Sequence, residues 1–328
     1  MPMKRLTTVL ACAAVLLMSL PASANDSVAS MGAGGLVLQR TEGITMVSED
    51  LFVSAREVRV TYRFLNHTTE GISTIVAFPM PDIAPGYAGD VGGRLDDPAH
   101  IVPFITWVDD RAVWTDVEYR AVVDGVDITD RLRALNLPLP PHGQDSWDAV
   151  NALPDSVRRT LTDEGILDSG RKPDGTLDWS MPNWTLKTTH YWTQWFPPGE
   201  PIEITHLYAP AIGGTVMTMV GRADSPMDEY RETYCLDETV IDAARRAQAN
   251  GRAFSETWLD YILTTGANWS GPIGDFRLVV DKGSTDNLVS FCGDGVRRIG
   301  PTTFEVRHAN YTPTRDLNVL ILQGDRSH

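Results

Sequence analysis

The residues best suited to bind another molecule lie in one aromatic-rich stretch, from Trp179 to Trp195. Exposed indole and phenol rings stack on sugar faces and pack against peptide side chains. On a strand over 187–196, alternate side chains point to opposite faces, so one set of rings can fill a core while the other faces outward. Packing of both sets inside the protein is the alternative. The predicted binding residues are Trp184, Tyr191, Trp192 and Trp195.

The carboxylates form no clear catalytic or metal-binding set. Asp109 and Asp110 lie near a predicted hairpin, and Asp178 lies beside the aromatic stretch. Two carboxyl groups about 5 to 9 Å apart support glycoside hydrolysis, but that separation depends on the fold. Calcium takes six to eight oxygen ligands, whereas the stretch 172–175 offers one acid at a turn. Two alternatives therefore stay open: an enzyme acting on envelope polysaccharide through paired carboxylates, and a calcium-stabilised structural module.

The histidines and potential nucleophiles match no known catalytic pattern. The seven histidines show neither the HxH nor the HExxH spacing typical of zinc sites. His190 and His206 lie on predicted strands joined by a turn and can be neighbours there. The sequence has no GxSxG nucleophile elbow. We therefore expect no catalytic residue, metal ion or cofactor, and we favour a protein that is not an enzyme.

The first 24 residues have the pattern of a signal peptide, and the predicted strands and helices follow them. Lys4 and Arg5 precede an apolar run over 9–20, and the small residues at 22–24 fit the specificity of signal peptidase. The run is too short for a stable membrane span, although an uncleaved signal anchor is the alternative. We expect cleavage after Ala24, so that the mature chain starts at Asn25, works outside the cytoplasm and has no membrane span.

Charge and cysteine content agree with export. The chain carries 28 basic and 43 acidic residues, a formal net charge of −15, which disfavours binding to nucleic acid and to anionic lipid surfaces. Loss of the leader leaves two cysteines, Cys235 and Cys292. An even number in an oxidising compartment predicts one disulfide bond between them, worth roughly 4 kcal/mol in the chain-entropy model. Two free buried thiols are the alternative.

The mature chain is predicted to be mainly β. In 58–64, apolar residues alternate with Arg59, Thr61 and Arg63, which indicates a half-buried strand. Many such short segments with frequent turns favour an antiparallel β-sandwich-like architecture, with a few short helices packed at one edge. Helices are expected at 155–164, 236–248 and 255–263. Further strands are expected at 35–39, 44–53, 72–78, 104–108, 112–123, 187–196, 202–208, 216–220, 276–280, 288–291, 303–307 and 317–322.

The pattern also predicts how the chain is divided. After the signal peptide (1–24), residues 25–215 form an N-terminal β-rich domain. This domain contains a loop and helix insertion near 136–178, where the strand pattern breaks. Residues 216–328 form a C-terminal α+β subdomain.

Several sequence blocks resemble one bacterial family across nearly the whole mature chain. These blocks lie at 25–27, 34–36, 48–51, 76–82, 191–194, 271–282 and 291–293. They resemble the exported bacterial proteins of domain-of-unknown-function family 4424. The resemblance implies a periplasmic location and supplies no activity, cofactor or catalytic residue. Residues 78–81 also resemble the strand-and-FPLP pattern of VIT domains, which are β-sandwich interaction modules.

Together these observations predict a non-enzymatic periplasmic binding or structural protein of the cell envelope. Its expected partner is an envelope protein or a glycan, recognised through the aromatic residues.

Overall fold

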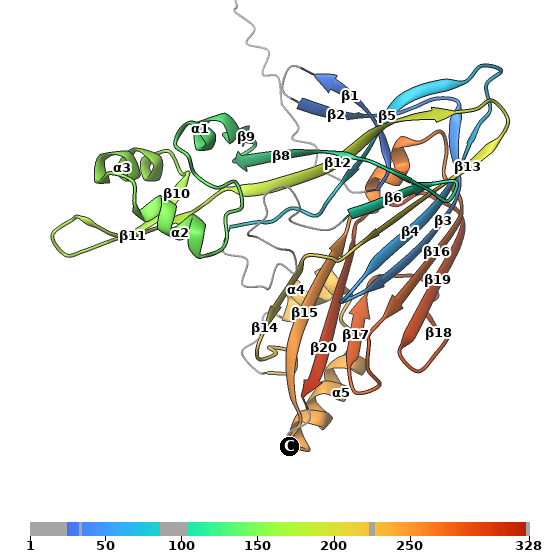
Figure 1. Ribbon diagram of the computed structural model, residues 1–328. Coiled ribbons are helices and arrows are strands. Elements are labelled where there is room, and N and C mark those ends of the chain that lie inside the picture. The colour runs from blue at the N-terminus through green and yellow to red at the C-terminus, as the bar shows by residue number, and fades with distance from the viewer. Residues whose placement is uncertain (1–24, 33–34, 86–103, 223–226, 326–328) are drawn as a thin grey trace, which may run out of the picture.

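The computed structural model describes residues 25–32, 35–85, 104–222 and 227–325, and these are mainly β (Figure 1). The mainly antiparallel, sandwich-like architecture with few helices confirms the predicted fold class. The largest sheet has eight strands, in the order β18 (Arg297–Arg298), β19 (Thr303–Tyr311), β16 (Ile273–Asp281), β3 (Ile44–Ser54), β4 (Val58–Asn66), β13 (Pro201–Tyr208), β6 (Phe104–Val108) and β7 (Arg111–Val113).

Two further sheets pack near this one. The six-stranded sheet has the order β2 (Gly35–Gln39), β1 (Ser27–Gly32), β5 (Ile72–Pro79), β12 (Thr185–Phe196), β8 (Asp116–Val123) and β9 (Val126–Asp127). The four-stranded sheet has the order β14 (Ile212–Thr215), β15 (Ala253–Tyr261), β20 (Leu317–Asp325) and β17 (Leu288–Phe291). Helices α4 (Met227–Tyr234) and α5 (Glu238–Ala249) contact the strands of the four-stranded sheet.

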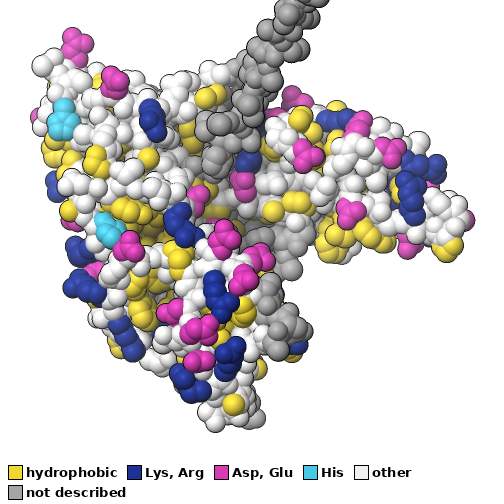
Figure 2. Space-filling model, turned by 180° about the vertical axis from the view of Figure 1, so that it is seen from behind, with side chains coloured by type: hydrophobic (Ala, Val, Ile, Leu, Met, Phe, Trp, Pro, Cys, Tyr) yellow, Lys and Arg dark blue, Asp and Glu magenta, His cyan; other side chains and the backbone are white. Residues whose placement is uncertain are grey.

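A separate arm extends from the six-stranded sheet and contains the region that the sequence sets apart near 136–178. It is built from α1 (Thr129–Ala134), α2 (Gln144–Asn151), α3 (Asp155–Asp163), β10 (Leu167–Arg171) and β11 (Leu177–Pro182). Leu132, Val150, Leu161 and Trp184 form part of its own hydrophobic cluster. Figure 2, seen from behind, shows the arm projecting to the right of the main body.

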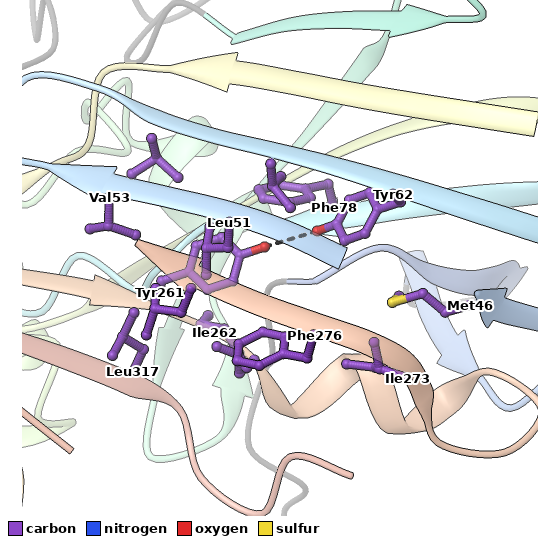
Figure 3. Close-up of a cluster of buried hydrophobic side chains, with 14 of the residues drawn as sticks. Met46, Leu51, Val53, Tyr62, Phe78, Tyr261, Ile262, Ile273, Phe276 and Leu317 are labelled. Atoms are coloured by element: carbon purple, nitrogen blue, oxygen red, sulfur yellow. Dashed lines mark hydrogen bonds between the residues drawn. The ribbon is translucent and has the colours of Figure 1, made fainter. Parts of the chain in front are cut away.

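The main core lies between the inner face of the eight-stranded sheet and the other two large sheets. Strands β3, β4 and β16 supply Leu51, Tyr62 and Phe276, while β5 and β15 supply Phe78 and Tyr261. Figure 3 shows these side chains pointing toward one another from strands far apart in the sequence. In β3 and β4, buried residues alternate with more exposed ones, which places one face of each strand in the core, whereas the end of β5 is buried on both faces.

The strands do not separate at residue 215, where the two predicted subdomains meet. Strand β3 pairs in parallel with β16, so that Leu51 lies opposite Leu278. The main core likewise takes residues from both sides of this point. The two predicted regions therefore share one sheet and one core.

Two predicted elements are wrong, and the rest of the molecule explains why. Residues 255–263, predicted as a helix, belong to strand β15, which pairs with β20 along its whole length and also with β14. Pairing with two neighbours outweighs a weak helical pattern of apolar residues. Residues 216–220 form no strand, and the side chains of Val216 and Met217 are exposed.

The predicted disulfide is present. Cys235, directly after α4, is bonded to Cys292, directly after β17, across a sequence separation of 57 residues. The bond ties α4 to the four-stranded sheet. Within the described ranges, no helix combines the length and apolar character needed to cross a membrane.

Candidate functional site

The four predicted binding residues do not form one exposed patch. Trp184 is completely buried, and its indole Nε1 donates to the carbonyl oxygen of Leu139 at 2.7 Å. Trp192 is also buried, and its Nε1 donates to Oε1 of Gln194 at 3.1 Å. Both rings therefore serve packing, and they have no surface to offer a partner in this conformation.

Tyr191 and Trp195 lie on the opposite face of β12, as the two-residue period of a strand requires. Tyr191 is half-buried, Thr193 is exposed, and Trp195 is 55% exposed. We call these three residues the β12 strip. The ring of Trp195 lies across Gly71, where an added Cβ would come within 1.9 Å of it. The strip therefore presents a ring held in place by a glycine.

The backbone beside the β12 strip is a sheet edge that lacks a second described strand. Strand β8 pairs with β12 only from Thr185 to Tyr191, where Tyr191 faces Asp116. Beyond this point, residues 192–196 pair only with β5 among the described strands. The carbonyl oxygen of Trp195 accepts a hydrogen bond from Nε2 of Gln194 at 2.7 Å. An unpaired edge offers N–H and C=O groups to an added strand.

A third exposed ring lies where the chain leaves this edge. Trp114 is 85% exposed and lies two residues before Asp116, between β7 and β8. The sequence predicts one continuous strand over 112–123, so the break that exposes Trp114 was missed. Its ring is therefore available at the surface beside the start of β8.

Tyr191 also lines a surface hollow of 750 Å³ between the six-stranded sheet and α1. Met31 and Val126 supply apolar walls, and acidic and basic side chains are both present in its rim. Burial, with Asp116 and Glu118 nearby, raises the pKa of Tyr191, so the phenol keeps its proton and can donate a hydrogen bond. Such a mixed lining suits a polypeptide or a sugar better than a purely apolar ligand.

The acids named in the enzyme hypothesis do not lie together. Asp109 and Asp110 form the turn between β6 and β7, both with positive φ, and the Asp109 carboxylate accepts from the backbone N–H of Glu203 at 2.9 Å. Asp178 lies on β11 in the arm, and its side chain is exposed. In Figure 1, β11 lies in the arm at the left, apart from β6 in the main body. Among the described residues, no group of three or more His, Cys, Asp or Glu could hold a metal ion.

The most unusual polar arrangement is one that the sequence analysis missed, a buried cluster in the main core. Asp26 and His206 are fully buried, with His206 Nε2 3.0 Å from Asp26 Oδ1. Glu49 is 1% exposed and accepts from Nδ2 of Asn25 at 3.1 Å. The hydroxyls of Tyr62 and Tyr261 are 2.8 Å apart (Figure 3). We call these residues the buried acid cluster: Asn25, Asp26, Glu49, Tyr62, His206 and Tyr261.

A bulge in β3 turns Glu49 into the core. The register of β3 against β4 shifts between Met46 and Ser48, which leaves Val47 on the outside. Gly274 permits this bulge, because an added Cβ there would come within 2.5 Å of the Val47 carbonyl oxygen. After the shift, Glu49 shares the inner face with Leu51 and Val53. That shared spacing of two is the sequence signal that could have identified Glu49 as an inward acid.

Burial dominates the acid–base properties of the cluster. It raises the pKa of Glu49 to about 8, although hydrogen bonds from Asn25 and Tyr261 oppose the shift. Burial also raises the pKa of Asp26, against the attraction of His206. A low-dielectric core disfavours the charged form of a carboxyl group, which explains both directions. The cluster is enclosed, so its chemistry concerns the folded core rather than an external substrate.

Comparison with known proteins gives one family match and distant structural similarity. The family model described as "Domain of unknown function (DUF4424)" matches residues 24–320. No curated protein matches the chain.

The similarity to solved structures is confined to the general course of the chain. A "putative nutrient binding protein" from Legionella pneumophila is 14% identical, with a TM-score of 0.45; the match covers 91% of this chain and 70% of that one. An M1 zinc metallopeptidase from Deinococcus radiodurans is 10% identical, with a TM-score of 0.29; that match covers 86% of this chain and 43% of the peptidase. Both scores are too low to carry a functional argument.

Proposed function

We propose that this chain, which belongs to the DUF4424 family of unknown function, is a non-enzymatic binding protein of the bacterial cell envelope. In this proposal it is exported to the periplasm and binds an extended segment of a partner protein along the edge of β12. The observation that carries the proposal is the coincidence of a strand edge at 192–196, unpaired among the described strands, with the exposed ring of Trp195 and the half-buried ring of Tyr191.

The geometry supports a peptide partner through two complementary contacts. An added strand forms main-chain hydrogen bonds with the edge, which supply affinity without demanding a particular sequence. Its side chains then alternate, and those on the outer face meet Tyr191 and Trp195. A glycan could stack on the same rings but would leave the strand edge unused.

Export is supported by features at both ends of the chain. The leader has the basic, apolar and small-residue parts of a signal peptide. The bond between Cys235 and Cys292 is of a kind that persists in oxidising compartments. The matched family region begins at residue 24, next to the expected cleavage site after Ala24. Cell fractionation with N-terminal sequencing tests this part; a cytoplasmic product that still carries Met1 contradicts it.

Site-specific photo-crosslinking tests the binding surface directly. A photoreactive amino acid at Thr193, on the β12 strip, should capture a defined partner in living cells. The same amino acid at Asp178, exposed on the arm, is the control position. Capture of the same proteins from both positions contradicts a specific surface, and capture of carbohydrate at 193 favours the glycan instead.

Substitution of the ring supplies a second test with a matched control. Trp195 and Trp179 are both about half exposed, and each lies over a glycine, Gly71 and Gly170 respectively. Trp195→Ala should abolish capture at 193, whereas Trp179→Ala should leave it unchanged. Equal effects of the two substitutions contradict the proposed role of the β12 strip.

A further inference from the structure

The residues directly after the expected cleavage site lie inside the main core rather than on the surface. Asn25, Asp26 and Ser27 are each 0% exposed. Trp269 Nε1 donates to the carbonyl oxygen of Asp26 at 2.6 Å, and Asn268 Nδ2 donates to Ser27 Oγ at 3.0 Å. The start of the mature sequence is therefore fixed by side chains near its C-terminal third.

This part of the core has more negative than positive groups. Asp26 and Glu49 are both buried carboxylates, and His206 is the partner of Asp26. Among the described residues, no Lys, Arg or His forms an ion pair with Glu49. A carboxylate buried without a counter-charge is costly, so Glu49 ionises in this core only if a cation lies close by.

The buried acid cluster also contains side-chain oxygen atoms that accept no hydrogen bond from a described residue. Oδ1 of Asn25 and Oδ2 of Asp26 are buried and have no hydrogen-bond partner in the part of the chain that the structure describes. Buried polar atoms are nearly always paired, so each unpaired one calls for an explanation. Two unpaired acceptors on consecutive residues point to a missing donor close to the backbone of Asn25.

We infer that the free α-ammonium group of Asn25, created by cleavage after Ala24, is the missing donor and counter-charge of the buried acid cluster. This inference rests on the proposed export for the cleavage itself. A peptide N–H donates one hydrogen bond, whereas an ammonium group donates three and adds one positive charge. Covalent geometry keeps the backbone nitrogen of Asn25 within about 5 Å of its own Nδ2, which contacts Glu49 at 3.1 Å.

Removal of the leader then completes the core in addition to releasing the protein. Before cleavage, the cluster contains Asp26, Glu49, His206 and the phenols of Tyr62 and Tyr261, with no ammonium group. After cleavage, the new charge pairs with Glu49 and the unpaired oxygen of Asp26. The processed chain should therefore be the more stable form.

The test compares two chains that differ only at the start. One begins at Asn25 after removal of a cleavable tag, and the other keeps Gly-Ser-Ala before Asn25. We expect the extended chain to melt at a clearly lower temperature. Glu49→Gln, which keeps the shape and removes the charge, should largely remove that difference. Equal melting temperatures of the two wild-type chains overturn the inference.

Chemical reactivity of the amine gives a readout that does not require the extended chain to fold. In the folded processed chain, acetic anhydride at neutral pH should acylate the α-amine of Asn25 at least 10-fold more slowly than in urea. Acylation at the unfolded rate overturns the inference. If sequencing of the exported protein shows another first residue, the export proposal fails at its cleavage site, whereas a reactive amine on Asn25 contradicts only this inference.

Discussion

Asp26 and His206 are 180 positions apart in the sequence, yet their side chains form a fully buried pair with Nε2 3.0 Å from Oδ1. The second ring nitrogen of His206 lies 3.0 Å from Oγ1 of Thr106. Phe104 stacks on the same imidazole. The pair therefore joins the segment at residue 26 to strand β13 of the eight-stranded sheet, and it holds that segment in one position.

Breaking this pair should destabilise the protein strongly. His206→Ala leaves the carboxyl group of Asp26 buried with neither oxygen paired, a change that costs on the order of 3–5 kcal/mol. Urea unfolding followed by tryptophan fluorescence measures the loss. His67→Ala is the matched control, because His67 is exposed and its imidazole Nε2 lies 2.8 Å from Oγ1 of Thr45, a contact outside the core. Equal losses in the two variants would contradict the role of the buried pair.

Glu49 should make an N-terminally extended chain less stable as the pH rises. Burial raises the pKa of Glu49 from 4.5 to about 8, so the folded chain keeps a proton that the unfolded chain releases. The stability that this proton provides is complete below pH 4.5 and is lost progressively up to about pH 8, by on the order of 4 kcal/mol.

Unfolding free energies of the extended chain at pH 5, 6, 7 and 8 measure this effect. In Glu49→Gln, the unfolding free energy of the extended chain should fall much less between pH 5 and 8. The remaining fall comes from Asp26 and the histidines. In the processed chain the decline should be smaller, because an ammonium group close by favours ionised Glu49. A decline of the same size in wild type and E49Q rules out Glu49 as its source.

Glu305 should act in the opposite direction at low pH. Hydrogen bonds from Arg277, Arg297 and Arg307 lower the pKa of Glu305 to about 2. A lowered pKa in the folded state gives stability that is present above pH 4.5 and disappears as the pH falls toward 2. Because solvent screens these outward-facing pairs, Glu305→Gln should cost only about 1 kcal/mol at pH 7.

Acid titration of the unfolding temperature distinguishes this contribution. The difference between wild type and E305Q should shrink as the pH falls toward 2 and vanish below it, where the carboxyl group is protonated in both the folded and the unfolded state. If the unfolding temperatures of wild type and E305Q still differ by the same amount at pH 2, packing rather than charge explains the lower stability of E305Q.

The disulfide bond should stabilise the four-stranded sheet and α4. Cys235→Ser with Cys292→Ser is expected to cost roughly 2–5 kcal/mol, because the unfolded chain gains freedom. Thermal unfolding with and without a reductant measures it. Reductant should lower the melting temperature of the wild type and leave the double variant unchanged; equal shifts in both chains point to another effect of the reductant.

The two-residue period of strands was enough to predict much of this fold. It identified β4 from the alternation of Val58, Val60 and Tyr62 with Arg59 and Thr61. It could not decide the state of residues 255–263, because Trp258, Tyr261 and Ile262 also fit a helix. Pairing with β20, a strand more than 50 residues further along, decided that segment. Long-range pairing of this kind leaves no local mark in the sequence.

The two-residue period also predicted part of the candidate site. The period placed Tyr191 and Trp195 on one face of β12, but it could not say which face is inside. The inner face carries His190 and Gln194, whose polarity suggests exposure. Inside the protein, Gln194 accepts from Trp192 and His190 contacts Thr115, and these partners come from the assembled sheet. Asp26 and Glu49 were missed because their partners likewise lie far away in the sequence.

Gly71 should control the position of the Trp195 ring and therefore capture at the β12 strip. An added methyl group at Gly71 would lie within 1.9 Å of the indole, so Gly71→Ala must displace the ring from its present place. We expect Gly71→Ala to reduce photo-crosslinking from position 193 at least several-fold without removing any aromatic residue. Partner capture, normalised to folded protein, measures the effect.

Gly170→Ala is the matched control for this substitution. An added methyl group there would lie within 2.2 Å of Nε1 of Trp179, so the variant displaces an equally exposed indole in the arm. It should leave capture at 193 unchanged, because the arm takes no part in the proposed contact. If both glycine variants reduce capture equally, ring position on β12 is not what the partner recognises, and the unpaired edge at 192–196 must then bind without help from Trp195.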